Sequence, residues 1–566
     1  MKKRPQEADG PSKSDVQKDL DYLNRRISEM ETERSSFISH WKELSEFVDP
    51  RRGRFFLEDR NKGDKRHKSI VNNHATVALR KATAGMFNGA MSPARPWFEY
   101  DLMNQDLLKD QATKAWLDML KFVVLKVLVS SNFYQMAPVM LRELLLFGTG
   151  CMTHTDDFED VARFYTHTCG SYLVAQNHRQ VIDTFARKFQ MTAIQMVSRF
   201  GYENCSVGVQ NNYDRGNYGQ WHTVYHFIEP NPFHDPSKLT SSFFPYRSIY
   251  FEPGKNKSEN VGYLSRKGYK GFPVYVPRWE TTNEDVYGTN CPGMTSLGDV
   301  KGLQFQEREK AKAIAKNNTP PMQGPTSLRN QPIANLPGGF TGTSASGQIK
   351  PLYEVDPRIQ EMMMDIKATE GRIDEGYFVP LFMAITEMQG IQPKNELQLK
   401  QIDSERLLQL GPVLEQIHGE WLSKMVLRVS HQVIAAGIMP PKPKQLQGHD
   451  LGLQFVSALA MAQRSVALGS IERTVSFAGA LRVGGWDVSH KIDPYGVFED
   501  YAALNGFPQK RIVDDATAQA QQQAQLAAMQ QQQALDNGQK VLNMAKMASD
   551  AKLNDKSVLS KVTGNA

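Results

Sequence analysis

The sequence predicts a mixed α+β fold built from several parts. Its 566 residues are too many for one hydrophobic core, and the length suggests roughly three or four domains. Segments with helical spacing flank a central region of short runs rich in Val, Tyr, Phe and Thr, which is typical of strands. A later stretch, 318–356, is rich in Gly, Pro, Ser and Thr and separates two further helices.

Residues 15–48 predict one long helix. Its apolar residues recur in alternating steps of four and three, with Arg34 in one slot, as in a heptad seam. The seam consists of Val16, Leu20, Leu23, Ile27, Met30, Phe37, Trp41, Leu44 and Val48. Asp15 is a suitable N-cap, and Asp49-Pro50 ends the helix. Such a helix either docks on a neighbouring subunit or packs within its own domain, and the spacing leaves both open.

The next segments alternate loop and helix. The basic stretch 51–68 is interpreted as a solvated loop, with a phosphate contact as the alternative. Residues 69–90 predict a helix rich in small residues, and the prolines of the following SPARPWF strip predict extended chain. Residues 108–147 predict two more helices. The second ends at Phe147-Gly-Thr-Gly150, a helix-to-strand turn that lacks the third glycine of a dinucleotide fingerprint.

Residues 151–290 predict antiparallel strands with one helix near 192–200. No metal site is expected here, because His222 and His226 lack supporting ligands at compact spacing. The four cysteines are far apart and predict free thiols. They are Cys151, Cys169, Cys205 and Cys291.

Composition narrows the functional classes. The 67 basic and 61 acidic residues give a net charge of +6, too mild for a dedicated nucleic-acid binder but compatible with transient contact to a polyanion. No apolar run approaches the length of about 18 residues that a membrane span needs. No metalloprotease, Walker A or nucleophile-elbow motif occurs. The sequence therefore predicts a protein without catalytic residues, cofactor or bound metal.

Residues 297–317 predict a helix with two distinct sides. Val300, Leu303, Ala311 and Ile314 share one side, and a basic stripe of Lys301, Arg308, Lys312 and Lys316 lies opposite. The stretch 318–356 is interpreted as a small, extended β-like unit completed by neighbours. A second helix begins after Asp356-Pro357. The apolar seams of such a stalk are too narrow to be buried by one chain, which favours an oligomer.

The C-terminal part begins with a break and ends in low complexity. Gly390 and Pro393 interrupt helix over 384–396. The next helix runs to about residue 436, with a seam of Leu407, Leu410, Leu414, Ile417 and Trp421 and a kink at Gly411-Pro412. Residues 451–508 predict short helices. Residues 509–553, rich in Ala and Gln, predict either an inter-subunit helical bundle or a disordered tail.

Several of these segments resemble one known family. WKELSEFVDPRRGR (41–54), MSPARPWF (91–98), ELLLFGTG (143–150) and the helix–loop–helix core occur in the same order as in the head-to-tail connector, or portal, proteins of short-tailed, T7-like bacteriophages. The motifs are moderately specific alone and more specific in this order. The resemblance implies a portal-type α+β fold.

The resemblance also divides the chain. It implies a wing over 1–290, a stem helix over 291–317, a clip over 318–356 and a second stem helix over 357–383. It further implies a tunnel loop over 384–396, a helical wing and crown over 397–508, and a C-terminal extension, helical barrel or disordered, over 509–566. Lys301, Arg308, Lys312, Lys316 and Lys394 then become candidate DNA-channel residues. Alternatively, the stripe pairs with acids on a neighbouring stem.

By the same resemblance, the expected function is structural. It implies a twelvefold homo-oligomeric ring at one capsid vertex, through which double-stranded DNA passes during packaging and ejection. Expected partners are the terminase large subunit, head-tail adaptor or tail proteins, and the major capsid and scaffolding proteins, with no membrane. The expected location is the virion, and the host cytoplasm during assembly. The alternative is a noncatalytic oligomeric tail or adaptor protein of a virion, which would not need a channel-lining loop.

Overall fold

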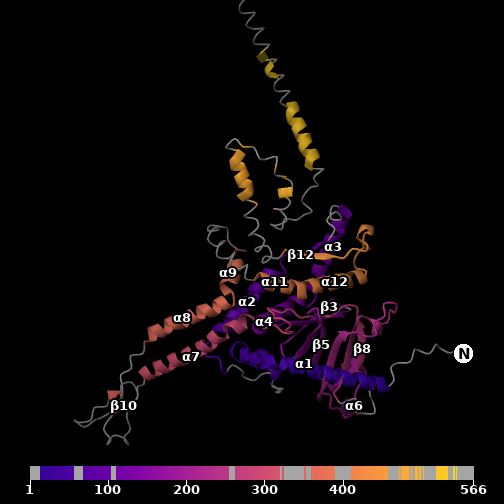
Figure 1. Cartoon of the computed structure of the whole chain (residues 1–566), viewed down its shortest axis with the longest axis vertical. Coiled ribbons are helices and arrows are strands. Elements are labelled where there is room, and N and C mark those ends of the chain that lie inside the picture. The colour runs from indigo at the N-terminus through magenta and orange to yellow at the C-terminus, as the bar shows by residue number, and fades with distance from the viewer. Residues whose placement is uncertain are drawn as a thin grey trace, which may run out of the picture. The chain divides into compact units, whose positions relative to one another are not determined.

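The structure is a computed structural model that describes most of the chain (Figure 1). The described residues are 13–56, 68–102, 110–157, 159–253, 262–318, 322–323, 350–351, 358–388, 410–456, 471, 473–482, 486, 491, 493–494, 496–498, 501, 518–532, 539–541 and 543–544. They divide into two units, Met1–Gln463 and Arg464–Ala566, which are described separately. The boundary falls inside the range expected for the helical wing and crown.

The first unit is a mixed α+β structure, as expected. Its longer helices are α1 (Lys13–Phe47), α2 (His74–Met91), α3 (Gln111–Ser130), α4 (Phe133–Phe147), α5 (Ala193–Phe200), α6 (Val207–Asp214), α7 (Pro292–Asn318), α8 (Ile359–Gly376), α9 (Val379–Met388), α11 (Gly411–Ile417) and α12 (Ser423–Ala435). Its strands are β1 (Phe98–Asp101), β2 (Cys151–Asp157), β3 (Val161–His167), β4 (Tyr172–Gln176), β5 (Ile182–Thr192), β6 (Trp221–Pro230), β7 (Tyr246–Phe251), β8 (Ser265–Tyr269), β9 (Val274–Tyr275), β10 (Met322–Gln323), β11 (Lys350–Pro351) and β12 (Gly452–Phe455).

The long first helix is confirmed, and it packs within its own chain. The N-terminal half of its seam, from Val16 to Met30, is buried on one face of the β4–β8 sheet. The C-terminal half, including Trp41 and Leu44, joins the main core. Arg34, the break in the seam, donates to the carbonyls of Gly170 and Tyr172 at 2.6 and 2.9 Å. Asp15 lies in the first turn rather than before it, since the helix begins at Lys13.

The predicted strands form two antiparallel sheets. Five strands pair in the order β4-β5-β6-β7-β8, and three pair in the order β3-β2-β9. Each strand of the larger sheet presents alternate residues to opposite faces. Thus Ala186, Phe227 and Ile249 meet α1, whereas Phe185 and Ile228 join the main core on the other face. Besides α5, near the predicted 192–200 helix, the region contains α6, which the sequence did not indicate.

Close helix contacts explain the small residues of α2. A Cβ at Gly85 would lie 2.3 Å from Cβ of Phe382 on α9, so glycine lets the two helices approach. At the end of α4, Gly148 has a φ of +75° and leads into β2, which confirms the predicted helix-to-strand turn. The SPARPWF strip is only partly extended: it turns at Pro93-Ala94 before the chain enters β1.

The prediction of only short helices over 451–508 is wrong at its start. Residues Gly452–Phe455 form β12, which pairs antiparallel with β1 from the SPARPWF region. Phe455 stacks on His418 with ring centroids 3.9 Å apart, and Trp97 lies parallel to Phe455 at 6.2 Å. A strand this short carries no clear pattern of its own, and only the distant partner and these rings define it.

The predicted helix ending near residue 436 is confirmed over its described part. It begins at Gly411, so Gly411-Pro412 forms its first turn rather than the predicted kink inside it, and it runs to Ala435 through a π-helical turn at His418–Leu422. Leu410, Leu414, Ile417 and Trp421 are fully or almost fully buried. Leu407 lies outside the described residues. Proline is tolerated at this position because the first helical N–H groups have no intrahelical acceptor.

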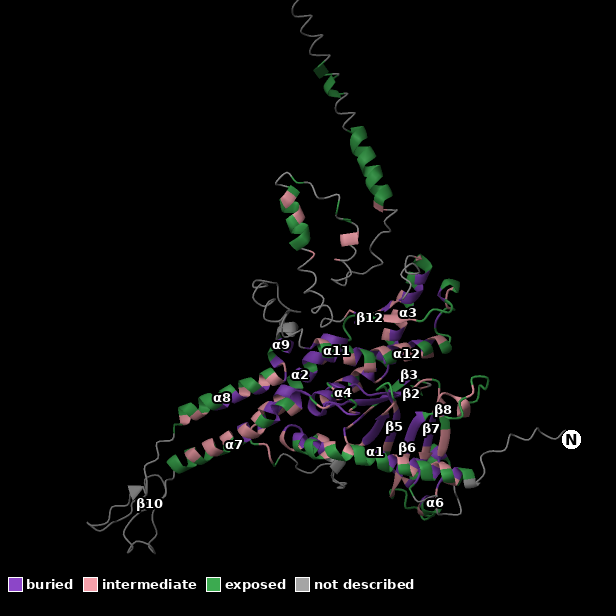
Figure 2. Cartoon of the chain, viewed as in Figure 1, coloured by how far each residue is buried: buried purple, intermediate pink, exposed green. Residues whose placement is uncertain are grey.

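In the second unit, residues 473–482 and 518–532 are helical. The latter helix lies in the Ala- and Gln-rich extension, and every residue from 519 to 532 is exposed (Figure 2). Good helix formers explain its conformation. Whether it joins a bundle of copies stays a prediction. The predicted break at Asn537-Gly538 lies outside the described residues.

An alanine at Leu23 should destabilise the chain itself. Leu23 is fully buried between α1 and the β4–β8 sheet, so Leu23→Ala should lower the free energy of unfolding by about 2–5 kcal/mol. Urea unfolding monitored by circular dichroism checks this, with exposed Glu31→Ala on the same helix as control. Equal midpoints for the two variants would contradict the packing of α1 on its own domain.

A buried carboxyl should make stability depend on pH. Glu143 on α4 is fully buried, and this burial raises its pKa to about 7 despite a 2.7 Å contact with Arg52. The folded state therefore holds a proton between the ordinary pKa and pH 7 that the unfolded state has released. Stability from this group falls as pH rises through that window.

The unfolding free energy of wild type minus that of Glu143→Gln should consequently fall from pH 4.5 to 7. Groups shared by both proteins cancel in this difference, which urea unfolding at several pH values measures. A difference that grows with pH would mean that Arg52 keeps the carboxylate ionised throughout.

Candidate functional site: the α7–α8 hairpin

Helices α7 and α8 form an antiparallel pair (Figure 1). Arg372 Nε donates to Asp299 Oδ1 at 3.0 Å, and further along the pair Gln306 Nε2 donates to Asp365 Oδ2 at 2.6 Å. At the base of the pair, a Cβ on Gly376 would lie 2.3 Å from Oγ of Ser296, so glycine allows the close contact there. With 27 residues, α7 is about 40 Å long.

Both helices anchor the hairpin to residues 71–74, where α2 begins. Gln304 accepts hydrogen bonds from the backbone N–H groups of Val71 and Asn72 at 2.6 and 2.9 Å and donates to the Asn72 carbonyl at 2.8 Å. His74, at the start of α2, lies 3.0 Å from Asp374 of α8. Gln304 is itself buried, so these bonds fix the hairpin where it leaves the core.

Burial along α7 stops halfway. Val300 and Leu303 are fully buried, but Ala311 is exposed and Ile314 is 39% exposed although both continue the same side of the helix (Figure 2). On α8, Ile366 and Ile373 are buried, whereas Met363 and Met364 are exposed. The predicted apolar seam is therefore covered at the base of the hairpin and uncovered further out.

The two basic residues nearest the base of the hairpin have partners in their own chain. Lys301 Nζ lies 2.7 Å from Glu43 of α1, and this hydrogen bond holds the pKa of the Glu43 carboxyl below its ordinary value. Arg308 donates to the Ser69 carbonyl at 3.1 Å. The alternative that the stripe pairs with acids of a neighbouring stem is thus not needed for Lys301.

The outer basic residues are more open. Lys312 is 66% exposed and pairs with Glu309, one turn earlier on α7, at 2.8 Å. Lys316 is exposed and makes no ion pair with the carboxylates of the described residues. Lys394 lies outside the described residues, so the structure brings together four of the five candidates.

Sequence reasoning missed Phe305, which is 64% exposed on the same side as the basic stripe. It stands four residues after Lys301 and three before Arg308, so helical spacing could have placed it there. Glu43 was missed for a different reason. It is 258 residues from Lys301, and no local pattern could have paired them.

The ends of the hairpin differ in detail from the expected boundaries. The second helix does not run unbroken to 383: α8 ends at Gly376, and Phe378, with a φ of +55°, separates it from α9. Helix α9 continues to Met388, into the range expected for the tunnel loop, whose residues 389–396 lie outside the described part. In the expected clip, β10 and β11 pair antiparallel, joining Met322 to Pro351 and Gln323 to Lys350.

Within the described residues, no group of three or more His, Cys, Asp or Glu side chains is placed to hold a metal ion. His222 and His226 instead contact Asn212 and Ser248. The four cysteines are buried and form no disulfide bond, as predicted. No helix within the described part combines the length and apolarity that crossing a membrane requires.

Comparison with known proteins identifies the family. Residues 20–513 match the family described as bacteriophage head to tail connecting protein. The portal protein of Salmonella phage epsilon15 is 37% identical over 547 residues, covering 96% of this chain and 98% of its own. The probable portal protein of Bordetella phage BPP-1 is 38% identical over 523 residues, covering 91% and 93%.

Solved structures of a gene transfer agent are more distant. Chains from its native virion and from the neck of its empty particle are each 12% identical to this one. They cover 76% and 77% of this chain and 99% and 90% of their own, with TM-scores of 0.29 and 0.33. These scores are too low to add to the description of the fold.

The match over most of the chain defines a phage head-tail connector, a noncatalytic structural component of the virion at the capsid neck. The chain belongs to the bacteriophage head-to-tail connecting protein family, the portal proteins. This confirms the family predicted from the motifs. The narrower T7-like assignment stays a prediction.

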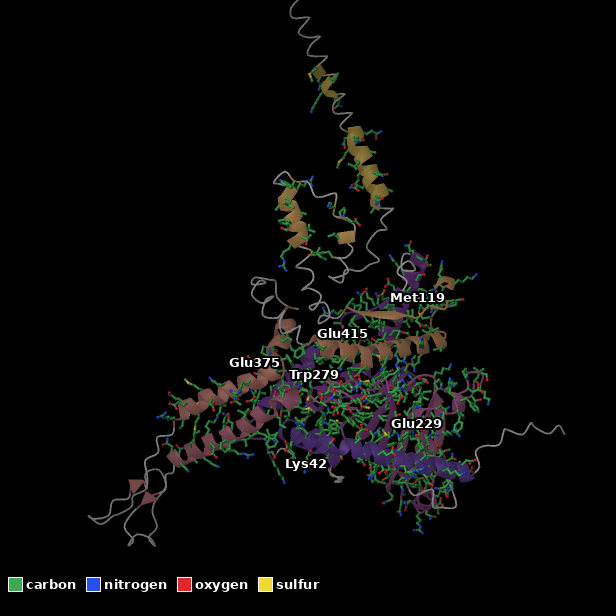
Figure 3. The ribbon with its side chains drawn as sticks, viewed as in Figure 1. Lys42, Met119, Glu229, Trp279, Glu375 and Glu415 are labelled. Carbon is green, nitrogen blue, oxygen red and sulfur yellow. The ribbon has the colours of Figure 1, made fainter. Side chains whose placement is uncertain are left out.

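The Lys301–Glu43 pair should contribute little to stability. Its side chains are 41% and 51% exposed, so Lys301→Met should change the unfolding free energy by less than about 1 kcal/mol. Arg247→Met is the contrast, because Arg247 is 6% exposed and pairs with the buried Glu229, which is labelled in Figure 3. Breaking that pair should cost roughly 3–5 kcal/mol in the same urea experiment. Similar losses in both variants would show that Lys301 holds the hairpin in place.

Proposed function

We propose that copies of this chain close into a ring in which the α7–α8 hairpins surround a channel for double-stranded DNA. The observation that carries the proposal is the half-covered hairpin. Its base is buried by the wing, while Ile314, Met363 and Met364 remain exposed further out. A neighbouring hairpin is the natural cover for such apolar side chains, because it repeats the same surface around a closed ring.

The outer basic residues suit a channel through which DNA slides. Lys312 and Lys316 provide positive charge near the far end of α7, and Glu309 partly offsets it. Phosphate contacts of this kind depend on salt and carry no sequence specificity. A few exposed lysines per copy would attract the DNA backbone without holding it in one position.

The remaining expectations complete the proposal. The clip over 318–356 would meet the terminase large subunit during packaging and head-tail adaptors afterwards. The segment following α9, including Lys394, would form the tunnel loop, and the wing would face the capsid and scaffolding proteins. Twelve copies per ring, and a short-tailed, T7-like phage, are expected from the motif resemblance. In the alternative, the chain forms a tail or adaptor ring, and changes to the hairpin would then leave packaging unaffected.

Electron microscopy of the purified full chain tests the ring directly. End-on class averages should show closed rings with a central hole, and counting their lobes gives the number of copies. Native mass spectrometry at micromolar concentration and physiological salt provides an independent mass. Monomers alone under both conditions would overturn the proposal.

Reversing charge on the outer part of α7 should impair packaging. In Lys312→Glu/Lys316→Glu, repulsion of phosphate should reduce the DNA packaged in a complementation assay by roughly tenfold, while rings still form. The matched control is Lys114→Glu/Lys126→Glu, which makes the same charge change at exposed positions of α3. Equal packaging by both double variants would show that Lys312 and Lys316 do not line the channel.

A further inference from the structure

A cleft of about 830 Å³ lies between the two sheets of the wing, far in sequence from the hairpin. Residues of β2 and β3 line one side, residues of β5, β6 and β7 line the other, and α5 contributes Ser198 and Arg199. Its volume is in the range of small-molecule sites. It opens on the face of the β4–β8 sheet that α1 does not cover, because strand residues alternate between faces.

The lining of the cleft is basic and has no acid. Arg187, Arg199, His154, His167 and His226 all line it, and no Asp or Glu is among the described lining residues. The neighbouring Asp156 is already engaged by Arg428 at 3.6 Å and by Gln432. Any anion inside the cleft would therefore meet positive or hydrogen-bonding groups without a competing carboxylate.

Arg187 is the central cation of the cleft. It makes no ion pair with the carboxylates of the described residues, and its buried Nε has no hydrogen-bond partner among them. Its guanidinium carbon lies 4.7 Å from the centre of the Phe189 ring. Burial lowers the pKa of Arg187, which expresses the cost of keeping this charge away from water and from an anion.

Arg199 reaches the cleft from α5. Its Nη2 donates to Tyr250 Oη at 3.0 Å, and its guanidinium carbon lies 4.9 Å from the Tyr250 ring centre. Arg199 is exposed. The tyrosine thus holds a solvent-accessible guanidinium where it can rotate onto a ligand entering the cleft.

The histidines supply neutral hydrogen-bonding groups. His167 contacts Thr153 Oγ1 at 3.0 Å, and His226 contacts Ser248 Oγ at 2.9 Å while stacking on Tyr250 at 3.8 Å. Burial, together with the nearby Arg187, lowers the pKa of both imidazoles well below the ordinary value. Burial is the main cause and the arginine charge adds to it, so both rings are held in the neutral form, which offers one N–H donor and one acceptor.

From this arrangement we infer that the wing cleft binds a phosphate-bearing small molecule, with Arg187 and Arg199 as its phosphate ligands. Two guanidinium groups offer the planar donor pairs that match phosphate oxygens. Half of the lining is aromatic or aliphatic, including Tyr165 and Phe189, so an organic group attached to the phosphate also has room. The inference does not depend on the channel proposed for α7–α8.

Calorimetric titration of the full chain with inorganic phosphate and, separately, with deoxyadenosine monophosphate tests this site at constant ionic strength. Saturable binding of at least one ligand is expected. Arg187→Gln should weaken it by roughly tenfold or more, since a charge-assisted bond is lost. Tighter binding of the nucleotide would show that the cleft prefers an organic phosphate. Equal binding of the two ligands would show that it recognises the phosphate group alone. Either result supports the inference.

Two further variants protect the conclusion. Arg199→Gln changes an exposed residue, so it should weaken binding without affecting folding. Arg163→Gln is the matched control: it removes the same charge from β3, where Arg163 pairs with Asp157 at 3.7 Å and does not line the cleft. No saturable binding to wild type, or equal losses in Arg163→Gln and Arg199→Gln, would overturn the inference.

Discussion

The structure depends on how far the rest of the first unit can cover α7. The core reaches this helix only over its first half, where Val300 and Leu303 are buried and Gln304 bonds the segment before α2. Further out, α7 and α8 pack on each other, and Ala311, Ile314, Met363 and Met364 are exposed. Two helices alone bury too little apolar surface to exclude water from both of their faces. The base of the hairpin is therefore covered by its own chain, and its outer half is the part that the proposed ring would cover.

The same constraint explains the division of charges on α7. Near the base of the hairpin, Lys301 pairs with Glu43 and Arg308 donates to the Ser69 carbonyl, so both residues help to attach the hairpin to the rest of the chain. Further out the core is absent, and Lys312 and Lys316 face water. One continuous stripe thus contains residues with two different environments. The position of each lysine relative to the core, rather than its place on the helical wheel, decides which of them remain exposed to solvent.

The two faces of the β4–β8 sheet are covered differently. One face of the β4–β8 sheet is sealed by α1, whose seam fits between Ala186, Phe227 and Ile249. The other face shares the main core at one end and opens into the basic cleft at the other. The paired and unpaired cations differ accordingly. Arg247 lies beside Glu229 and Asp19, whereas Arg187 lies in the cleft without a carboxylate from the described residues.

Much of this protein was determined by the sequence itself. The seam of α1, the turn at Gly148, the antiparallel strands and the helix through Trp421 follow from local periodicity and turn chemistry, which neighbouring residues specify. Only the tertiary structure decided that α1 packs on its own sheet, that Gly452–Phe455 becomes a strand, and that Lys301 meets Glu43. These outcomes join residues tens to hundreds of positions apart. Local sequence spacing cannot predict such contacts, because they are set by packing of the whole chain.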